Sequence, residues 1–312
     1  MQLSAAGLTG LQAGSSCSGP LSGVEPHGGN QEALALRLGC RPDQLLDASA
    51  SLVPFGPPRW LRRSLAQALW GSALRSYPDR QHAGLRQCIA QWHGLDPAQV
   101  LPGNGAAELF TWMARDAASL GMSALPVPGF ADYPRALRTW DAGSSALRLP
   151  LHWAAQGPWS FPELPEFEER PRVIWITNPH NPTGQLWTRR SLEPLLDRFA
   201  LVVADEAFLP LVPGGEEQSL VPLLEHHPNL VVIRSLTKLL AIAGLRLGYA
   251  LGTPERLRRW AAWRDPWPLN GLAVAAGMAW FSAPARARQW QGRVQRWTAR
   301  EGAWLQQQLA AL

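Results

Sequence analysis

The sequence predicts an α/β protein in which helices flank a mostly parallel central sheet, with a smaller second domain. Three apolar, strand-like runs begin at Val173, Leu201 and Leu230, nearly thirty residues apart. This spacing leaves room for a helix between consecutive strands, which is the connection that parallel neighbours need. Each run ends in polar residues, as is typical of the carboxyl edge of an open α/β sheet. With 312 residues, the chain is long enough for two lobes.

The other elements follow from apolar spacing and breaker residues. The three strands should cover 173–177, 201–204 and 230–233, and segment 45–51 should be extended up to a proline-rich break at 54–58. Helices are expected over 31–38, 59–70, 84–93 and 106–120. The tryptophan- and proline-rich stretch 260–280 predicts a bend into one long helical tail that reaches residue 312.

Composition excludes several functional classes. Hydrophobic content of 46% with 17% charged residues is ordinary for a globular protein. The net charge of +5 comes from dispersed arginines without a long basic run, so nucleic-acid binding is not predicted. No apolar run is long enough for a membrane span. The three cysteines are far apart and the seven histidines lack metal-site spacing, which indicates a reducing cytoplasmic compartment and no metal site.

Lys238 is the only lysine among the 29 Lys and Arg residues. Taken alone, a single lysine is explained as well by drift in base composition that spared one lysine codon as by a functional role. However, guanidinium stays protonated at any working pH, whereas a lysine amine can lose its proton and form a Schiff base. Segment 230–249 reads as a buried strand that runs into a turn. Lys238 should therefore lie at the carboxyl end of a strand, where such sheets carry their chemistry.

Complementary polar groups follow the other strands. Asn181 lies in a stiff turn after the first strand, and Asp205 follows the second, where a carboxylate can keep a pyridinium nitrogen protonated. Ser235 and Arg246 follow the third, and the glycine-containing segment 103–108 supplies backbone N–H groups for an anion at a helix start. Taken singly, Asp205 would more often be a helix cap or ion-pair partner, and Asn181 a turn residue. Their joint order predicts a site for pyridoxal 5'-phosphate (PLP).

Over roughly residues 26–312, these motifs are similar to fold-type I PLP-dependent enzymes of the aminotransferase superfamily. Segments 27–30 and 47–51 resemble the amino-terminal signature of threonine-phosphate decarboxylases, which act in cobalamin biosynthesis. Phe208 stands where histidinol-phosphate aminotransferases usually carry tyrosine. Segments 235–249 and 266–270 also resemble the decarboxylases more closely.

The resemblance implies a role for each residue of the predicted site. Lys238 would hold the cofactor covalently, and Asp205 would bind its ring nitrogen. Asn181 would contact the ring hydroxyl oxygen, and Phe130 would stack on the ring face. The groups implied to bind the cofactor phosphate are Ser235, Arg246, the backbone amides of Ala106 and Ala107, and Tyr77 of the partner subunit. The residues implied to bind the substrate are His27, Gly28, Ser51 and Asn181.

The implied reaction is decarboxylation of L-threonine O-3-phosphate to (R)-1-aminopropan-2-yl phosphate by an obligate homodimer. If the Cα–H bond breaks instead of the Cα–carboxylate bond, the same site would transaminate, as histidinol-phosphate aminotransferases do. A third interpretation is a catalytically impaired homologue that keeps the cofactor. Neither nucleic acid nor membrane is an expected partner.

The expected parts of the chain are a mobile extension (1–26), a segment for the small domain and substrate site (27–58), a large PLP-binding domain (59–270) and the start of an incomplete C-terminal small domain (271–312). Two features depart from the family pattern. Ser51 and Val53 stand where relatives usually carry asparagine. Relatives also continue beyond the position of residue 312, with arginines that bind the substrate carboxylate and phosphate.

Overall fold

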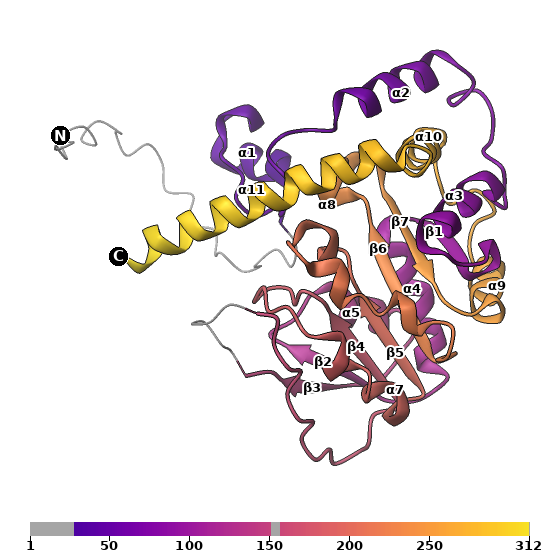
Figure 1. Cartoon of the computed structure of the whole chain (residues 1–312), viewed down its shortest axis with the longest axis vertical. Helices are drawn as coiled ribbons and strands as arrows, with labels where there is room; N and C mark the ends of the chain where they lie inside the picture. The colour runs from indigo at the N-terminus through magenta and orange to yellow at the C-terminus, as the bar shows by residue number, and fades with distance from the viewer. Residues whose placement is uncertain (1–27, 151–156, 312) are drawn as a thin grey trace. The chain divides into compact units, whose positions relative to one another are not determined.

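The computed structural model describes residues 28–150 and 157–311 (Figure 1). The chain divides into two compact units, Met1–Ala50 and Ser51–Leu312. The expected boundaries at residues 26, 58 and 270 remain a prediction. Among the described residues, none of the helices is both long enough and apolar enough to cross a bilayer.

The described part of the first unit contains helix α1 (Gln31–Leu38), as predicted, and a 3-10 turn, η1 (Pro42–Gln44). Segments 28–30 and 47–50 lie together, because Ser49 Oγ accepts a hydrogen bond from Gly29 N at 2.9 Å. A side chain at Gly28 would place its Cβ only 2.2 Å from the Ser49 carbonyl oxygen, so this approach requires glycine. Segment 45–51 contains no strand and forms a loop.

The second unit is built on a seven-stranded sheet with the order β1-β7-β6-β5-β4-β2-β3. The predicted strands are present as β4 (Val173–Thr177), β5 (Leu201–Asp205) and β6 (Leu230–Ser235), which are adjacent and parallel. The remaining strands are β1 (Val100–Asn104), β2 (Ser123–Val127), β3 (Ser144–Arg148) and β7 (Leu247–Leu251). Within this sheet, β7 runs opposite to the other six strands, so the prediction of a mostly parallel sheet is confirmed.

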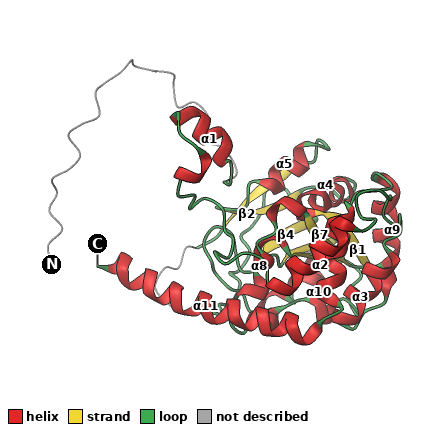
Figure 2. Ribbon diagram, turned by 90° about the horizontal axis from the view of Figure 1, so that it is seen from above, coloured by secondary structure: helices red, strands yellow, loops and turns green. Residues whose placement is uncertain are grey.

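Helices cover both faces of this sheet, and the strand residues alternate between two apolar cores. Val202, Ala204 and Val232 belong to one core, whereas Val203 and Val231 belong to the other. Figure 2 shows the strands between two groups of helices. One group is α2 (Arg59–Trp70), α3 (Ala83–His93), α10 (Gly271–Phe281) and α11 (Pro284–Ala310). The other is α4 (Gly105–Ala118) and α5 (Asp132–Arg138), with α9 (Pro254–Trp263) packed against α4.

Short helical segments connect these elements. The α-helical ones are α6 (Arg189–Leu192), α7 (Leu195–Arg198) and α8 (Thr237–Leu240). The 3-10 segments are η2 (Pro97–Gln99), η3 (Leu209–Leu211), η4 (Gly215–Gln218), η5 (Val221–Leu223) and η6 (Ala243–Leu245). The predicted long helical tail is present as α11, which Pro284 begins, and Ser282 and Ala283 separate it from α10.

Candidate functional site

The predicted site residues come from one edge of the sheet. Strands β1, β2, β4, β5 and β6 share one direction, so their carboxyl ends meet at the same edge. In the strand register, Thr177 pairs with Asp205, and Ser235 pairs with Gly248. Side chains alternate along a strand, so Thr177, Asp205 and Ser235 lie on the sheet face that α4 and α5 cover.

Asp205 is the most buried charged group of the site, with 4% of its surface exposed. Its Oδ2 accepts a hydrogen bond from the Tyr133 hydroxyl at 2.7 Å, and its Oδ1 accepts one from Ala207 N at 3.0 Å. Burial raises the pKa of Asp205 to about 6, although both hydrogen bonds oppose the shift. A cation placed against this carboxylate would restore its charge and relieve the cost of burial.

Tyr133 belongs to α5 and is itself buried. Its hydroxyl also lies 2.7 Å from Thr177 Oγ1, at the end of β4. Burial, together with the charge of Asp205, raises the pKa of Tyr133 well above its usual value, so the phenol keeps its proton. Tyr133 is therefore a fixed hydrogen-bond donor to Asp205, and Thr177 orients it.

Lys238 lies on α8, three residues after the end of β6, and is half-buried. Burial lowers the pKa of its amine, Arg246 lowers it further, and Asp205 opposes the shift. The Phe208 ring centre is 5.7 Å from Nζ. Among the described residues, no group forms a hydrogen bond or an ion pair with Nζ. Lys238 is thus an amine that loses its proton more readily than a free lysine, which is the condition for nucleophilic attack.

The start of α4 and the start of β7 form an anion-binding arrangement. The first turn of α4 carries the backbone N–H groups of Ala106 and Ala107. Arg246 packs on this turn so closely that a Cβ at Gly105 would be 2.6 Å from its guanidinium nitrogen. A Cβ at Gly248 would be 2.8 Å from Ala106 N. The backbone contact at Gly248 requires glycine, and the positive φ of 74° at Gly105 favours it. The arrangement places a cation beside the positive end of a helix dipole.

Ser235 adjoins this arrangement, because its register partner is Gly248. It is buried, and its Oγ accepts a hydrogen bond from Thr237 N at 3.2 Å. The hydroxyl proton remains free to donate to a further acceptor. The structure therefore brings Ser235, Arg246 and the first turn of α4 together.

Two further predicted residues approach Asp205 from neighbouring loops. Phe130 is half-buried and contacts Tyr133 edge-on, with ring centres 5.5 Å apart. Asn181 is half-buried in the turn after β4. The two loops are joined, because His180 Nε2 lies 2.7 Å from the Pro128 carbonyl oxygen. Phe130 and Asn181 thus belong to the same edge as Asp205.

The remaining predicted residues are not brought into this cluster by any contact. Tyr77 is 78% exposed and stacks on Trp267, with ring centres 4.5 Å apart. Ser51 is exposed, and Gly28 belongs to the first unit. His27 lies outside the described residues.

Sequence analysis missed Tyr133 and Thr177 as parts of the site. The available signal for Tyr133 was its position three residues after Phe130 in a segment with helical spacing. For Thr177 the sequence pattern indicates only the end of a strand. Tyr133 donates to Asp205, and Thr177 holds the Tyr133 hydroxyl from the end of β4.

Comparison with known proteins identifies the family. The sequence model for aminotransferase class I and II matches residues 45–307. The chain belongs to this family. Its members are PLP-dependent, and the described residues fit that cofactor. They offer a buried carboxylate suited to a pyridinium, a deprotonable amine and an anion site suited to a phosphate.

Individual relatives include two kinds of enzyme. The chain is 34% identical to threonine-phosphate decarboxylase of Salmonella typhimurium, over 92% of this chain and 77% of that protein. It is 32% identical to a putative threonine-phosphate decarboxylase of Caldanaerobacter subterraneus, over 73% of this chain but only 61% of that protein. It is also 33% identical to histidinol-phosphate aminotransferase of Stutzerimonas stutzeri, over 81% of this chain and 68% of that protein.

Solved structures agree on the fold. L-threonine-O-3-phosphate decarboxylase from Porphyromonas gingivalis matches with a TM-score of 0.62 and 26% identity, over 78% of this chain and 72% of that one. Histidinol-phosphate aminotransferase from Sinorhizobium meliloti, solved in complex with pyridoxal-5'-phosphate, matches with a TM-score of 0.67 and 21% identity, over 87% and 71%. The fold-type I prediction is thereby confirmed.

Proposed function

We propose that this protein uses PLP to decarboxylate L-threonine O-3-phosphate to (R)-1-aminopropan-2-yl phosphate, as a step of cobalamin biosynthesis. The observation that carries the proposal is the buried Asp205 carboxylate, which acts electrostatically on the half-buried amine of Lys238 at the carboxyl edge of the sheet. The choice of substrate is supported by the 34% identity to a threonine-phosphate decarboxylase.

In this proposal each residue of the cluster has one task toward the cofactor. Asp205 accepts a hydrogen bond from the ring nitrogen, Lys238 holds the cofactor covalently, and Phe130 covers the ring face. Asn181 binds the ring hydroxyl oxygen. The phosphate is bound by Ser235, Arg246 and the N–H groups of Ala106 and Ala107. When bound, PLP supplies a conjugated ring that accepts the electron pair of a bond broken at the substrate Cα.

Lys238 is also the proposed proton carrier. Burial and Arg246 lower the pKa of its amine, so Lys238 releases a proton more readily than a free lysine, as a proton carrier must. In decarboxylation the Cα–carboxylate bond breaks, carbon dioxide leaves, and Lys238 Nζ delivers the proton that takes its place on Cα. Burial of Asp205 beside Tyr133 excludes water from the ring-nitrogen end of the site. His27, Gly28, Ser51 and Asn181 are the proposed substrate-binding residues.

We further propose that the active form is a homodimer in which Tyr77 of the partner subunit binds the cofactor phosphate. In one protomer Tyr77 is 78% exposed, so its hydroxyl is available to another chain. Stacking on Trp267 limits the freedom of its ring. A light-scattering mass of one 34.2 kDa chain for the cofactor-loaded, active protein would contradict the dimer.

A second candidate is a histidinol-phosphate-type aminotransferase, which the 33% identity to the Stutzerimonas stutzeri enzyme favours. In that reaction Lys238 would remove a proton from Cα, and the carboxylate would stay. The same residues would hold the cofactor in both candidates, which differ in whether the Cα–carboxylate or the Cα–H bond of the substrate would break.

One assay separates the candidates. PLP-loaded protein is incubated with phosphothreonine while carbon dioxide release is followed, and in parallel with histidinol phosphate and a 2-oxo acid while amino transfer is followed. Carbon dioxide release with formation of aminopropanol phosphate is the expected result. Amino transfer alone would replace the proposal with the second candidate. Cofactor binding without either reaction would indicate a catalytically impaired homologue.

A further inference from the structure

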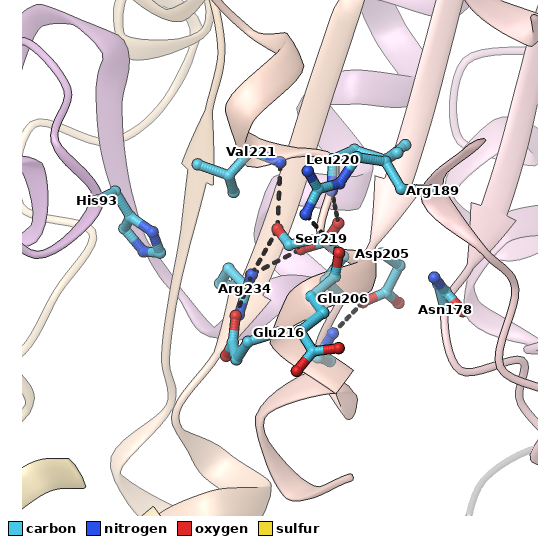
Figure 3. A network of polar contacts seen from close by, with 12 residues as sticks. His93, Asn178, Arg189, Asp205, Glu206, Glu216, Ser219, Leu220, Val221 and Arg234 are labelled. Carbon is cyan, nitrogen blue, oxygen red and sulfur yellow. Dashed lines mark hydrogen bonds and ion pairs between the residues drawn. The ribbon is translucent and has the colours of Figure 1, made fainter. Parts of the chain in front are cut away.

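A second charged network lies at the same sheet edge but on the opposite face (Figure 3). Arg234 NH2 is 2.7 Å from Glu206 Oε2, and these side chains are only 4% and 0% exposed. Arg234 also binds both carboxylate oxygens of Glu216 at 2.9 Å. Ser219 Oγ lies within 2.9 Å of both Arg234 NH2 and Glu206 Oε2. The network therefore joins β5, β6 and the segment around η4.

The network is adjacent in sequence to two residues of the cofactor cluster. Glu206 directly follows Asp205, and Arg234 directly precedes Ser235. Because side chains alternate, each neighbouring pair points to opposite faces of the sheet. The backbone adds a link between the two strand ends, since Glu206 N donates to the Ile233 carbonyl oxygen at 2.9 Å. A movement of Arg234 or Glu206 would thus move Ser235 or Asp205.

Burial makes this network sensitive to the loss of one member. Burial raises the pKa of Glu206, and the charge of Arg234 opposes that shift. Glu206 also accepts a hydrogen bond from Leu220 N at 2.7 Å. Without Arg234, the fully buried Glu206 carboxylate would lose its counter-charge and would be left facing the partly exposed Glu216 carboxylate. The strand ends would then have to separate, or the carboxylates would have to take up protons.

We propose that Arg234 is a positioning residue for the cofactor site, which it holds in shape by binding Glu206, Glu216 and Ser219 on the far face of the sheet. The inference rests on the proposed PLP site and adds a residue that does not touch the cofactor. Arg234 acts on the site through the backbone, because one peptide bond joins it to Ser235 and one joins its partner Glu206 to Asp205. A merely structural role would lower stability and leave cofactor binding unchanged.

The same sheet provides a matched control at its other edge. Asp116, 5% exposed near the end of α4, binds Arg256 Nε and Arg259 NH2, both at 2.8 Å. Arg256 also donates to the carbonyl oxygen of Pro228, just before β6 begins. Arg256→Met therefore breaks a buried ion pair in the same domain, far along the strand from Asp205 and Ser235.

The test compares Arg234→Met with Arg256→Met in the full chain. PLP affinity is measured by titration at a temperature where circular dichroism shows both variants folded, and the visible absorption maximum of the bound cofactor is recorded. Arg234→Met is expected to weaken PLP binding by about tenfold or more and to shift the absorption maximum. Arg256→Met should change the affinity by less than about twofold, because distant sites act independently.

A gentler variant keeps the proposal falsifiable if Arg234→Met does not fold. Glu216 is 41% exposed, so Glu216→Gln should fold, and about threefold weaker PLP binding is expected. Wild-type affinity and an unchanged absorption maximum in a folded Arg234→Met or Glu216→Gln protein would overturn the proposal. If the wild-type chain itself binds no PLP, the proposed function fails instead, and the two failures are therefore distinguishable.

Discussion

The two faces of the sheet's carboxyl edge differ in how their buried charged side chains are partnered. On one face, Arg234 and Glu206 are almost inaccessible and form an ion pair. On the other face, Asp205 is equally buried, its donors among the described residues are Tyr133 and Ala207, and burial raises its pKa to about 6. The Lys238 amine, which has no hydrogen bond or ion pair with the residues that the structure describes, interacts with it electrostatically. In the proposed function, the ion-paired charges hold the strand ends in place, whereas Asp205 and Lys238 act on the cofactor.

The largest expected effect follows from removing the amine on the incomplete face. Lys238→Arg keeps a cation but cannot bind the cofactor covalently, so activity should fall by about 10³-fold or more. Borohydride reduction followed by peptide mapping should label Lys238 in the wild type and nothing in the variant, while circular dichroism stays unchanged. A label on the N-terminal amine of the wild type would contradict the assignment.

The raised pKa of Asp205 predicts a pH-dependent stability of the cofactor-free protein. A carboxyl whose pKa rises from 3.8 to about 6 on folding stabilises the fold below pH 4, and this contribution is lost as the pH rises through 6. The shift corresponds to about 3 kcal/mol. Urea unfolding of the wild type and Asp205→Asn at pH 4 and pH 7 measures it.

The difference in unfolding free energy between the wild type and Asp205→Asn isolates the contribution of Asp205. Burial lowers the pKa of His82 to about 4, so His82 changes the stability in the opposite direction, but it does so in both proteins. The wild type should lose stability relative to Asp205→Asn as the pH rises. Equal pH slopes in the two proteins would mean that Asp205 titrates normally.

Activity should also depend on the charge of Asp205. Asp205→Asn is expected to bind PLP yet lose one to two orders of magnitude in turnover, since a charge-assisted hydrogen bond contributes about 1.5–3 kcal/mol. Asp116→Asn is a suitable control, because it neutralises a buried carboxylate at the other edge of the sheet. Near-normal turnover in Asp205→Asn would show that the carboxylate does not face the ring nitrogen.

The smallest expected effect concerns the donor to Asp205. Tyr133→Phe removes one hydrogen bond to the carboxylate, worth about 1.5 kcal/mol or roughly tenfold in PLP affinity. Because that bond lowers the pKa of Asp205, its loss should raise the pKa further and move the acid limb of PLP binding to higher pH. Phe208→Tyr, which changes an aromatic ring near Lys238 instead, should leave this limb in place. An unshifted acid limb in Tyr133→Phe would exclude the positioning role.

Three strands that are buried on both faces were predictable from the sequence, whereas the strands at the edges of the sheet were not. Strands β4, β5 and β6 are covered on both faces and therefore read as continuous apolar runs. Strand β1 contains Pro102 and Gly103, which act as breakers in a sequence pattern but are accommodated at the sheet edge. The other edge strand, β3, is largely exposed and polar. Only pairing with β2 makes it a strand.

The sequence by itself determined which chemistry is available, because Lys238, Asp205 and Asn181 each follow a recognisable strand, and parallel strand ends must meet. Tertiary structure alone decided how these groups are held. Tyr133 and Asp205 are 72 positions apart in the chain, and Arg234 meets Glu216 across 18. Such pairs leave no periodic signal in the sequence, since their contact depends on which helix covers which sheet face. Burial then sets the pKa values, and burial exists only in the folded chain.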